Sequence, residues 1–266
     1  MKRVKGPKGN PEPLNFERKK LQNDMIKKTV NLTDHRVIHQ FRGTAGNIYI
    51  VEDRRKGVTC LVDCGMPSDA ENLAASLQNF APLKRVVCTH FHVDHVSGWI
   101  CLKNRHTDCK IWFHEAARSF VAGDARIPLP SFVDIQEILI PCMKEAGYFP
   151  GFFDLVNGGL YGTPFKKRFP LDRVTFFSNE PSVLPGFTTI HTPGHRPDSV
   201  SFFDADSGIL ICGDLLMVID GKLIINTFVA SKKDQEASIN KIKKLEGLKY
   251  IFPGHGDCVP FTVDQI

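Results

Sequence analysis

Metal-competent side chains gather in one short segment of the sequence, Thr89-His90-Phe91-His92-Val93-Asp94-His95. Three imidazoles and one carboxylate this close together cannot all be buried without partners, because each polar group left dry costs about 1–3 kcal/mol or more. Apolar runs lead into and out of the segment, which indicates a loop anchored in the fold. A divalent cation satisfies imidazole nitrogens and carboxylate oxygens together, so the segment predicts a metal site.

Three further candidate ligands lie far along the chain: His195, Asp214 and His255. Each follows a predicted strand and has a glycine before it, and glycine permits tight turns and close backbone approach. Seven candidates are too many for one catalytic ion with three protein ligands, but they fit two ions if one carboxylate bridges them. The full set is His90, His92, Asp94, His95, His195, Asp214 and His255.

Two cations at such a site have a defined chemistry. When they are about 3.5–4 Å apart, they hold a hydroxide between them and lower its pKa towards neutrality. One ion then polarises a carbonyl or phosphoryl oxygen while the hydroxide attacks. The sequence therefore predicts a hydrolase with two divalent ions. Zinc is the first choice, and iron or manganese suits the same donors.

The elements that position these residues follow from the hydrophobic pattern. Short β-branched or aromatic runs separated by turn residues predict strands at 36–41, 47–52, 58–63, 85–89, 110–114, 174–177, 187–191, 200–204, 209–212, 223–227 and 250–252. Helices are expected at 68–79, 96–104, 115–121, 132–146 and 232–245, the first opened by a capping box of Ser68 and Glu71. Strands in two runs, each followed by helices, indicate packed sheets with helices outside, an α/β layered domain.

The chain is expected to form one domain over residues 29–266, preceded by a flexible or helical N-terminal arm at 1–28 with a short helix at 16–28. The segment at about 123–185 mixes an apolar helical stretch with Gly- and Phe-rich loops. We expect it to be an insertion that packs over an edge of the core and determines the substrate.

The composition excludes several classes of protein. Apolar residues make up 42% and charged residues 24%, which argues against disorder, and no apolar run approaches the ~18 residues that span a bilayer. A net charge of +5 permits an anionic substrate without requiring nucleic acid. Eight cysteines form no CxxC pair, which favours buried reduced thiols in a cytoplasmic protein. The oligomeric state is not readable from the sequence.

These motifs together resemble the metallo-β-lactamase superfamily. The HxHxDH segment, the three later ligands and the strand end Leu61-Val62-Asp63-Cys64-Gly65 match its order and spacing over about residues 36–260. The resemblance implies a four-layer αββα sandwich with its metals at the sheet edge. It implies His90, His92 and His195 on one metal, Asp94, His95 and His255 on the other, and Asp214 between them. It also implies that Asp63 orients a ligand histidine or its loop; Asp63 and Asp94 are the catalytic candidates.

The substrate is expected to be a small ester, thioester, lactone or phosphoester, for which Arg196 and His191 are the candidate contacts. The basic cluster Lys166, Lys167 and Arg168 is another candidate receptor for an anion. Besides a non-enzymatic, metal-dependent binding module, two alternative enzymatic functions stay open. One is an endoribonuclease of the same fold, although nucleic acid is not the favoured partner. The other is an oxidoreductase similar to persulfide dioxygenases with a single iron, against which the complete second ligand set weighs.

Overall fold

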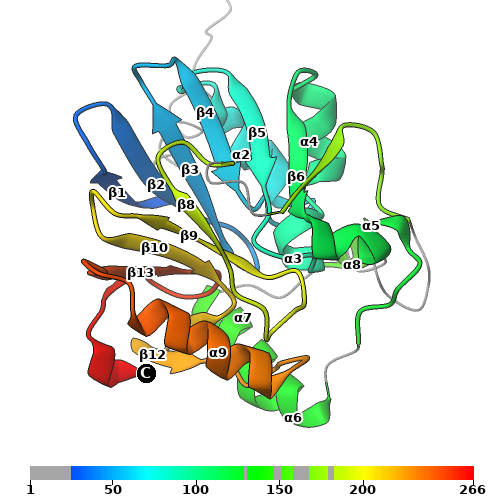
Figure 1. Cartoon of the computed structure of the whole chain (residues 1–266). Helices are drawn as coiled ribbons and strands as arrows, with labels where there is room; N and C mark the ends of the chain where they lie inside the picture. The colour runs from blue at the N-terminus through cyan, green and yellow to red at the C-terminus, as the bar shows by residue number, and fades with distance from the viewer. Residues whose placement is uncertain (1–24, 129–130, 147–150, 158–167, 179–182) are drawn as a thin grey trace, which may run out of the picture.

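Two β-sheets packed face to face form the centre of the molecule (Figure 1). The computed structural model describes residues 25–128, 131–146, 151–157, 168–178 and 183–266. The larger sheet has the order β1-β2-β3-β4-β5-β6-β7. Its strands are β1 Ile26–Asn31, β2 Arg36–Arg42, β3 Asn47–Asp53, β4 Val58–Val62, β5 Leu83–Val87, β6 Lys110–His114 and β7 Val174–Phe177.

The second sheet has the order β14-β13-β10-β9-β8, and a separate hairpin joins β11 to β12. These strands are β8 Thr188–His191, β9 Val200–Asp204, β10 Ile209–Gly213, β11 Leu216–Ile219, β12 Lys222–Ile225, β13 Tyr250–Pro253 and β14 Val259–Pro260. The helices are α2 Asp69–Leu77, α3 Val93–Val96, α4 Trp99–Arg105, α5 Arg118–Ala122, α6 Phe132–Asp134, α7 Ile140–Ala146, α8 Phe152–Asn157 and α9 Lys232–Lys243, with short η turns at Glu115–Ala117, Ile135–Leu139 and Val263–Gln265.

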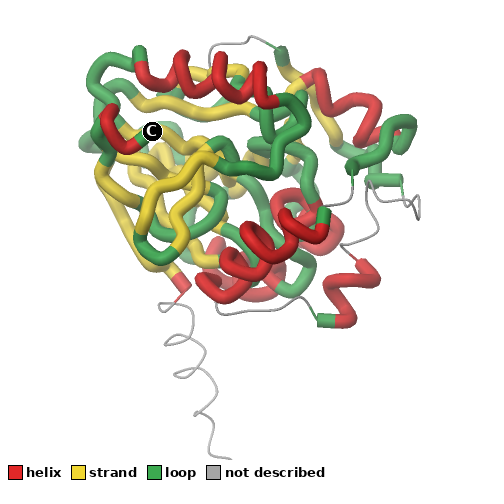
Figure 2. The backbone as a smooth tube through the Cα atoms, turned by 90° about the horizontal axis from the view of Figure 1, so that it is seen from below, coloured by secondary structure: helices red, strands yellow, loops and turns green. Residues whose placement is uncertain are grey.

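Three apolar layers hold this arrangement together. Between the two sheets lie side chains such as Val62, Phe202 and Phe252. Helices α2 and α4 cover the outer face of the large sheet, and α9 packs Ile239 and Ile242 against the second sheet. Figure 2 shows helices on opposite sides of the strands. Helix–sheet–sheet–helix is the order expected from the sequence, and the αββα prediction is confirmed.

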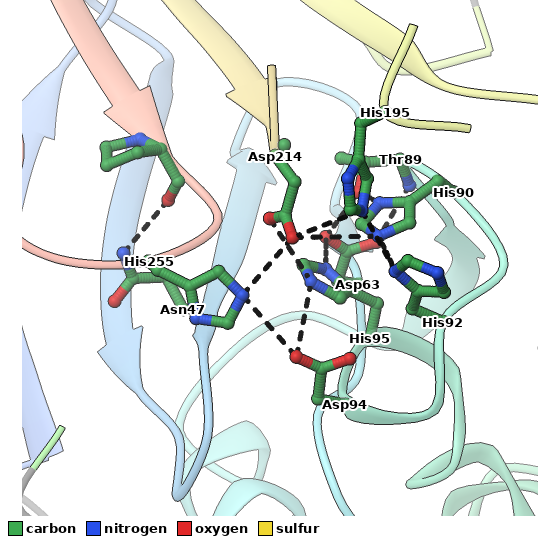
Figure 3. A network of polar contacts seen from close by, with 12 residues as sticks. Asn47, Asp63, Thr89, His90, His92, Asp94, His95, His195, Asp214 and His255 are labelled. Carbon is green, nitrogen blue, oxygen red and sulfur yellow. Dashed lines mark hydrogen bonds and ion pairs between the residues drawn. The ribbon is translucent and has the colours of Figure 1, made fainter. Parts of the chain in front are cut away.

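The strand directions bring the predicted site residues to one edge. Strands β4, β5 and β6 are parallel, and so are β10 and β13. Carboxyl ends of parallel strands meet at the same edge of a sheet. The segments that follow β4, β5, β8, β10 and β13 carry Asp63, the HxHxDH segment, His195, Asp214 and His255. The close-up in Figure 3 shows these side chains converging from both sheets.

Part of the segment predicted as an insertion, 123–185, belongs to the large sheet. Its residues 174–177 form β7, which pairs in parallel with β6 and belongs to the large sheet. Within the described part, Ile138 and Cys142 pack against Met217 of β11, and the carboxylate of Asp154 in α8 accepts from the Ser68 amide. The insertion therefore contacts the core beside the edge where the ligands gather.

Other local expectations also changed. Residues 26–28, predicted as part of an N-terminal helix, instead begin β1, while 1–24 lie outside the described residues. The expected capping box at Ser68 is absent, because that residue has helical backbone angles and its side chain makes no capping bond. Within the described residues, every helix is too short or too polar to cross a bilayer.

Candidate metal centre

Seven side chains from distant parts of the sequence form two adjacent ligand groups. One group is His90, His92, His195 and Asp214, and the other is Asp94, His95 and His255. Within each group the candidate ligand atoms lie within 4.8 Å of one another. The structure thus brings together every metal ligand that the sequence analysis named, in the two sets that the resemblance implied.

Three imidazole nitrogens converge in the first group. Nδ1 of His92 lies 3.0 Å from Nε2 of His90 and 2.9 Å from Nε2 of His195. Nε2 of His90 and of His195 lie 3.8 and 3.6 Å from Oδ2 of Asp214. Three nitrogens and one carboxylate oxygen pointing to a common centre are a donor set that zinc and similar ions take.

The second group shares Asp214 with the first. Nε2 of His255 lies 3.4 Å from Oδ2 of Asp94 and 3.3 Å from Oδ2 of Asp214, and Nε2 of His95 lies 3.4 Å from Oδ1 of Asp214. The Asp214 carboxylate is therefore near histidines of both groups, as a bridging ligand must be (Figure 3).

Hydrogen bonds from Nδ1 fix the orientation of three of the five histidines directly, and a fourth, His90, is held by the Thr89 hydroxyl. Nδ1 of His195 donates to the Phe228 carbonyl at 2.6 Å, and Nδ1 of His255 donates to the Ala45 carbonyl at 2.9 Å. Nδ1 of His95 donates to Asp63 at 2.8 Å. A proton held on Nδ1 leaves the lone pair on Nε2, the atom that faces the centre in each case.

Asp63 organises the HxHxDH segment from behind. Its carboxylate accepts from the amide of Thr89, from the Thr89 hydroxyl and from Nδ1 of His95, each at 2.8 Å. Because that hydroxyl donates to Asp63, its oxygen is left to accept Nδ1–H of His90 at 3.1 Å. Asp63 thus holds two candidate ligands in place, His95 directly and His90 through Thr89. Its backbone has φ of 61°, a conformation that is uncommon for residues other than glycine.

The pKa of the histidines shifts in opposite directions in the two ligand groups. Burial lowers the pKa of His90, His92 and His195, so these rings are neutral and ready to bind a cation. Burial also opposes charge on His255 and Asp214, but their mutual attraction outweighs it. This raises the pKa of His255 and lowers that of Asp214.

The donor set fits a pair of cations. Asp214 and four of the five histidines are buried, and His92 is half-buried, yet Nε2 of His95 and Oδ1 of Asp214 make no hydrogen bond in the described structure. Buried polar atoms of this kind are usually satisfied, and a metal ion is one way to satisfy them. His90, His92 and His195 suit one ion, Asp94, His95 and His255 suit the other, and Asp214 suits both.

A family model supports the same conclusion. The model described as "Metallo-beta-lactamase superfamily" matches residues 41–255, which include all seven candidate ligands. The chain belongs to the metallo-β-lactamase superfamily. Because the match covers most of the chain, both the fold and the ligand-bearing segments are those of this superfamily.

Relatives in the superfamily are distant in sequence. "Probable metallo-hydrolase YflN" of Bacillus subtilis (strain 168) is 24% identical over 242 residues, 85% of each chain. A hydroxyacylglutathione hydrolase of Cereibacter sphaeroides is 27% identical over 208 residues, which are 78% of this chain but only 61% of that enzyme. The crystal structure of TTHA1623 in a di-iron-bound form has a TM-score of 0.54 and 22% identity, covering 82% of this chain and 91% of that one.

The two predicted substrate residues lie in different places. Arg196, next to His195, is 3% exposed and its guanidinium lies over the ring of Phe120. His191 belongs to neither ligand group. It stacks on His114 with ring centroids 4.2 Å apart, in an open pocket of about 450 Å³. Of the basic cluster, Lys166 and Lys167 lie outside the described residues.

Sequence reasoning missed three residues that support the metallo-β-lactamase centre. The carboxylate of Asp198 accepts from the amide of Phe91 at 2.7 Å and so ties the His195 loop to the HxHxDH segment. Asn226 donates to the Asp214 carbonyl at 3.0 Å, and Phe228 lies against the rings of His92 and His195. None stands in a motif, and no sequence signal marked them.

Proposed function

We propose that this chain is a hydrolase that holds two divalent cations and cleaves a small ester, thioester, lactone or phosphoester. One observation carries the proposal: two ligand groups meet at a single shared carboxylate, Asp214. If the site held a single ion at the first group, Asp94, His95 and His255 would have no cation to bind. The complete second group therefore argues against the mononuclear iron alternative.

The cations supply the reactivity, and the protein supplies their geometry. When bound, two ions lower the pKa of a shared water towards neutrality and polarise the bond to be cleaved. Asp214 would be the ligand common to both ions. The hydrogen bonds of Asp63, Ala45 and Phe228 to the ligand histidines prevent those rings from turning when a substrate enters. Asp94 and His92 are the partly exposed ligands, with 26% of the Asp94 side chain accessible, so the centre can be reached from their side.

The relatives favour hydrolysis of a small molecule. YflN is described as a probable metallo-hydrolase, and the relative from Cereibacter sphaeroides is described as a hydroxyacylglutathione hydrolase, whose substrate is a thioester. We take zinc as the resident metal, with iron as the alternative that the di-iron neighbour supports. Small esters and thioesters are therefore the first substrates to test.

The decisive experiment combines elemental analysis with activity. We expect about two metal ions per purified chain and turnover of 4-nitrophenyl ester, thioester, lactone or bis-phosphate reporters. Asp214→Asn should lose at least one ion and lower kcat/KM by more than about 100-fold, because the neutral amide is a poor bridge. The matched control is Asp220→Asn, an exposed carboxylate at the tip of the β11–β12 hairpin, which should match the wild type. Full activity in metal-free protein would refute the proposal.

A further inference from the structure

Arg196 carries a buried positive charge without adequate partners. Its residue exposure is 3%, and Nε and Nη2 make no hydrogen bond in the described structure. A guanidinium has five N–H donors, and burial without acceptors is costly for a charged group. Such an arrangement needs either a strong protein partner or a ligand that completes it.

The nearest carboxylate does not complete it. Oδ1 of Asp198 lies 3.9 Å from Nε of Arg196, which is beyond hydrogen-bond distance, and that oxygen also has no hydrogen-bond partner. The other oxygen of Asp198 is committed to the Phe91 amide at 2.7 Å. The ring of Phe120 holds one face of the guanidinium, 4.3 Å from its central carbon, and leaves the N–H edge without an acceptor.

The position of Arg196 is next to the metal centre. It directly follows the ligand His195 in the chain. The carboxylate of Asp198, 3.9 Å from Nε of Arg196, accepts from the amide of Phe91, which lies between the ligands His90 and His92 in the chain. Arg196 therefore lies beside the two segments that carry His92 and His195.

We propose that Arg196 is the receptor for an anionic oxygen group of the substrate, a carboxylate or a phosphate, held beside the His92–His195 side of the centre. That this anionic group belongs to a substrate that is hydrolysed rests on the proposed function, whereas the binding of an anion at Arg196 does not. Planar guanidinium donors match two oxygens of such a group at once, and a charge-assisted pair in a buried site is strong. The unpartnered N–H groups of Arg196 would then be satisfied only when substrate is bound.

The test uses two reporters of equal length that differ in charge: mono-4-nitrophenyl succinate and 4-nitrophenyl butyrate. Replacing Arg196 alone would leave Asp198 as an unpaired buried charge, so the main variant is the double Arg196→Gln, Asp198→Asn. The Asn oxygen can still accept from the Phe91 amide. We expect kcat/KM for the succinate ester to fall about 10- to 100-fold through KM, with the butyrate ester nearly unchanged.

Two further variants separate charge from structure. Arg118→Gln is the matched control, because that guanidinium also lies 4.3 Å from an aromatic ring, that of Phe176, and it should leave both reporters unaffected. Arg196→Lys keeps a charge without the planar fork and should give an intermediate loss on the succinate ester. Equal losses on both reporters in the double variant would mean a structural role and would overturn the proposal.

A binding measurement covers the case in which neither ester is hydrolysed, which would count against the proposed reaction alone. Inorganic phosphate is titrated by calorimetry into metal-loaded wild type, the double variant and Arg118→Gln. Phosphate bound to the cations contributes in all three. An affinity at least tenfold weaker in the double variant only would support the receptor, and equal affinities in all three would overturn it.

Discussion

Asp63 accepts three hydrogen bonds from the HxHxDH segment and the threonine before it. Oδ2 of Asp63 accepts from both the Thr89 hydroxyl and Nδ1 of His95, and Oδ1 accepts from the Thr89 amide, so Asp63→Asn loses either the first two bonds or the third. We expect metal affinity to fall about 10- to 100-fold and activity with it. The measurement is metal content after dialysis against a graded series of chelator concentrations.

A second substitution separates the contact of Asp63 with His90, made through the Thr89 hydroxyl, from its direct contact with His95. Thr89→Val removes only the hydroxyl between Asp63 and His90, so it should weaken the first ligand group and spare His95. Equal metal retention in Asp63→Asn and the wild type would show that packing alone holds the ligand rings.

Gly254 lies against the bridging carboxylate. A Cβ built there would be 2.2 Å from Oδ1 of Asp214 and 3.0 Å from Cε1 of His95. Gly254→Ala should therefore displace Asp214 and lower metal content to below two ions per chain while the fold is retained. Elemental analysis and circular dichroism check this. Gly57→Ala is the control, since no atom lies within 4 Å of its built Cβ, and it should keep both ions despite the strain of its positive φ.

At the scale of elements, the ends of β6 and β8 meet through the stacked rings of His114 and His191. Burial, reinforced by His191, lowers the pKa of His114 from 6.5 to about 4, so its ring is neutral in the folded protein. The stabilisation from the neutral ring is complete above about pH 6.5 and is lost as the pH falls towards 4.

His114→Asn should therefore lose less stability than the wild type between pH 6.5 and pH 4. Urea midpoints at several pH values measure the difference. His35→Asn, in the turn before β2, is the control and should follow the wild type. Parallel curves for His114→Asn and the wild type would mean that the stacked pair does not influence stability over this range.

Element prediction succeeded where hydrophobic patterns were local. Eight of the eleven predicted strands differ from the observed ones by at most two residues at each end, and β6, β7 and β9 have the predicted bounds. Strand β1 was missed because its basic, polar sequence forms a strand only by pairing with β2. The β11–β12 hairpin did carry a signal, since Asp220-Gly221 favours a two-residue turn, and it was overlooked.

At the scale of the whole molecule, metal binding should stabilise the fold. A ligand that binds only the folded state at about 1,000 times its Kd adds about 4 kcal/mol to the free energy of unfolding. Removing the metals with a chelator should then lower Tm by about 8–16 °C, and adding zinc should restore it. Calorimetry measures this, with Asp214→Asn expected to show a smaller change. An unchanged Tm in chelator would mean that the seven side chains hold no ion.

The sequence alone determined the candidate ligands, their order along the chain and the packing of sheets with helices outside, because these depend on residue type and on local hydrophobic period. The four-layer αββα order was implied by the resemblance to the superfamily. Only the tertiary structure decided what surrounds the ligands. The bond from His255 to the Ala45 carbonyl joins residues 210 positions apart, and that from Asp198 to the Phe91 amide spans 107. Such partners follow from how two sheets pack, a property of the whole chain that no short motif records.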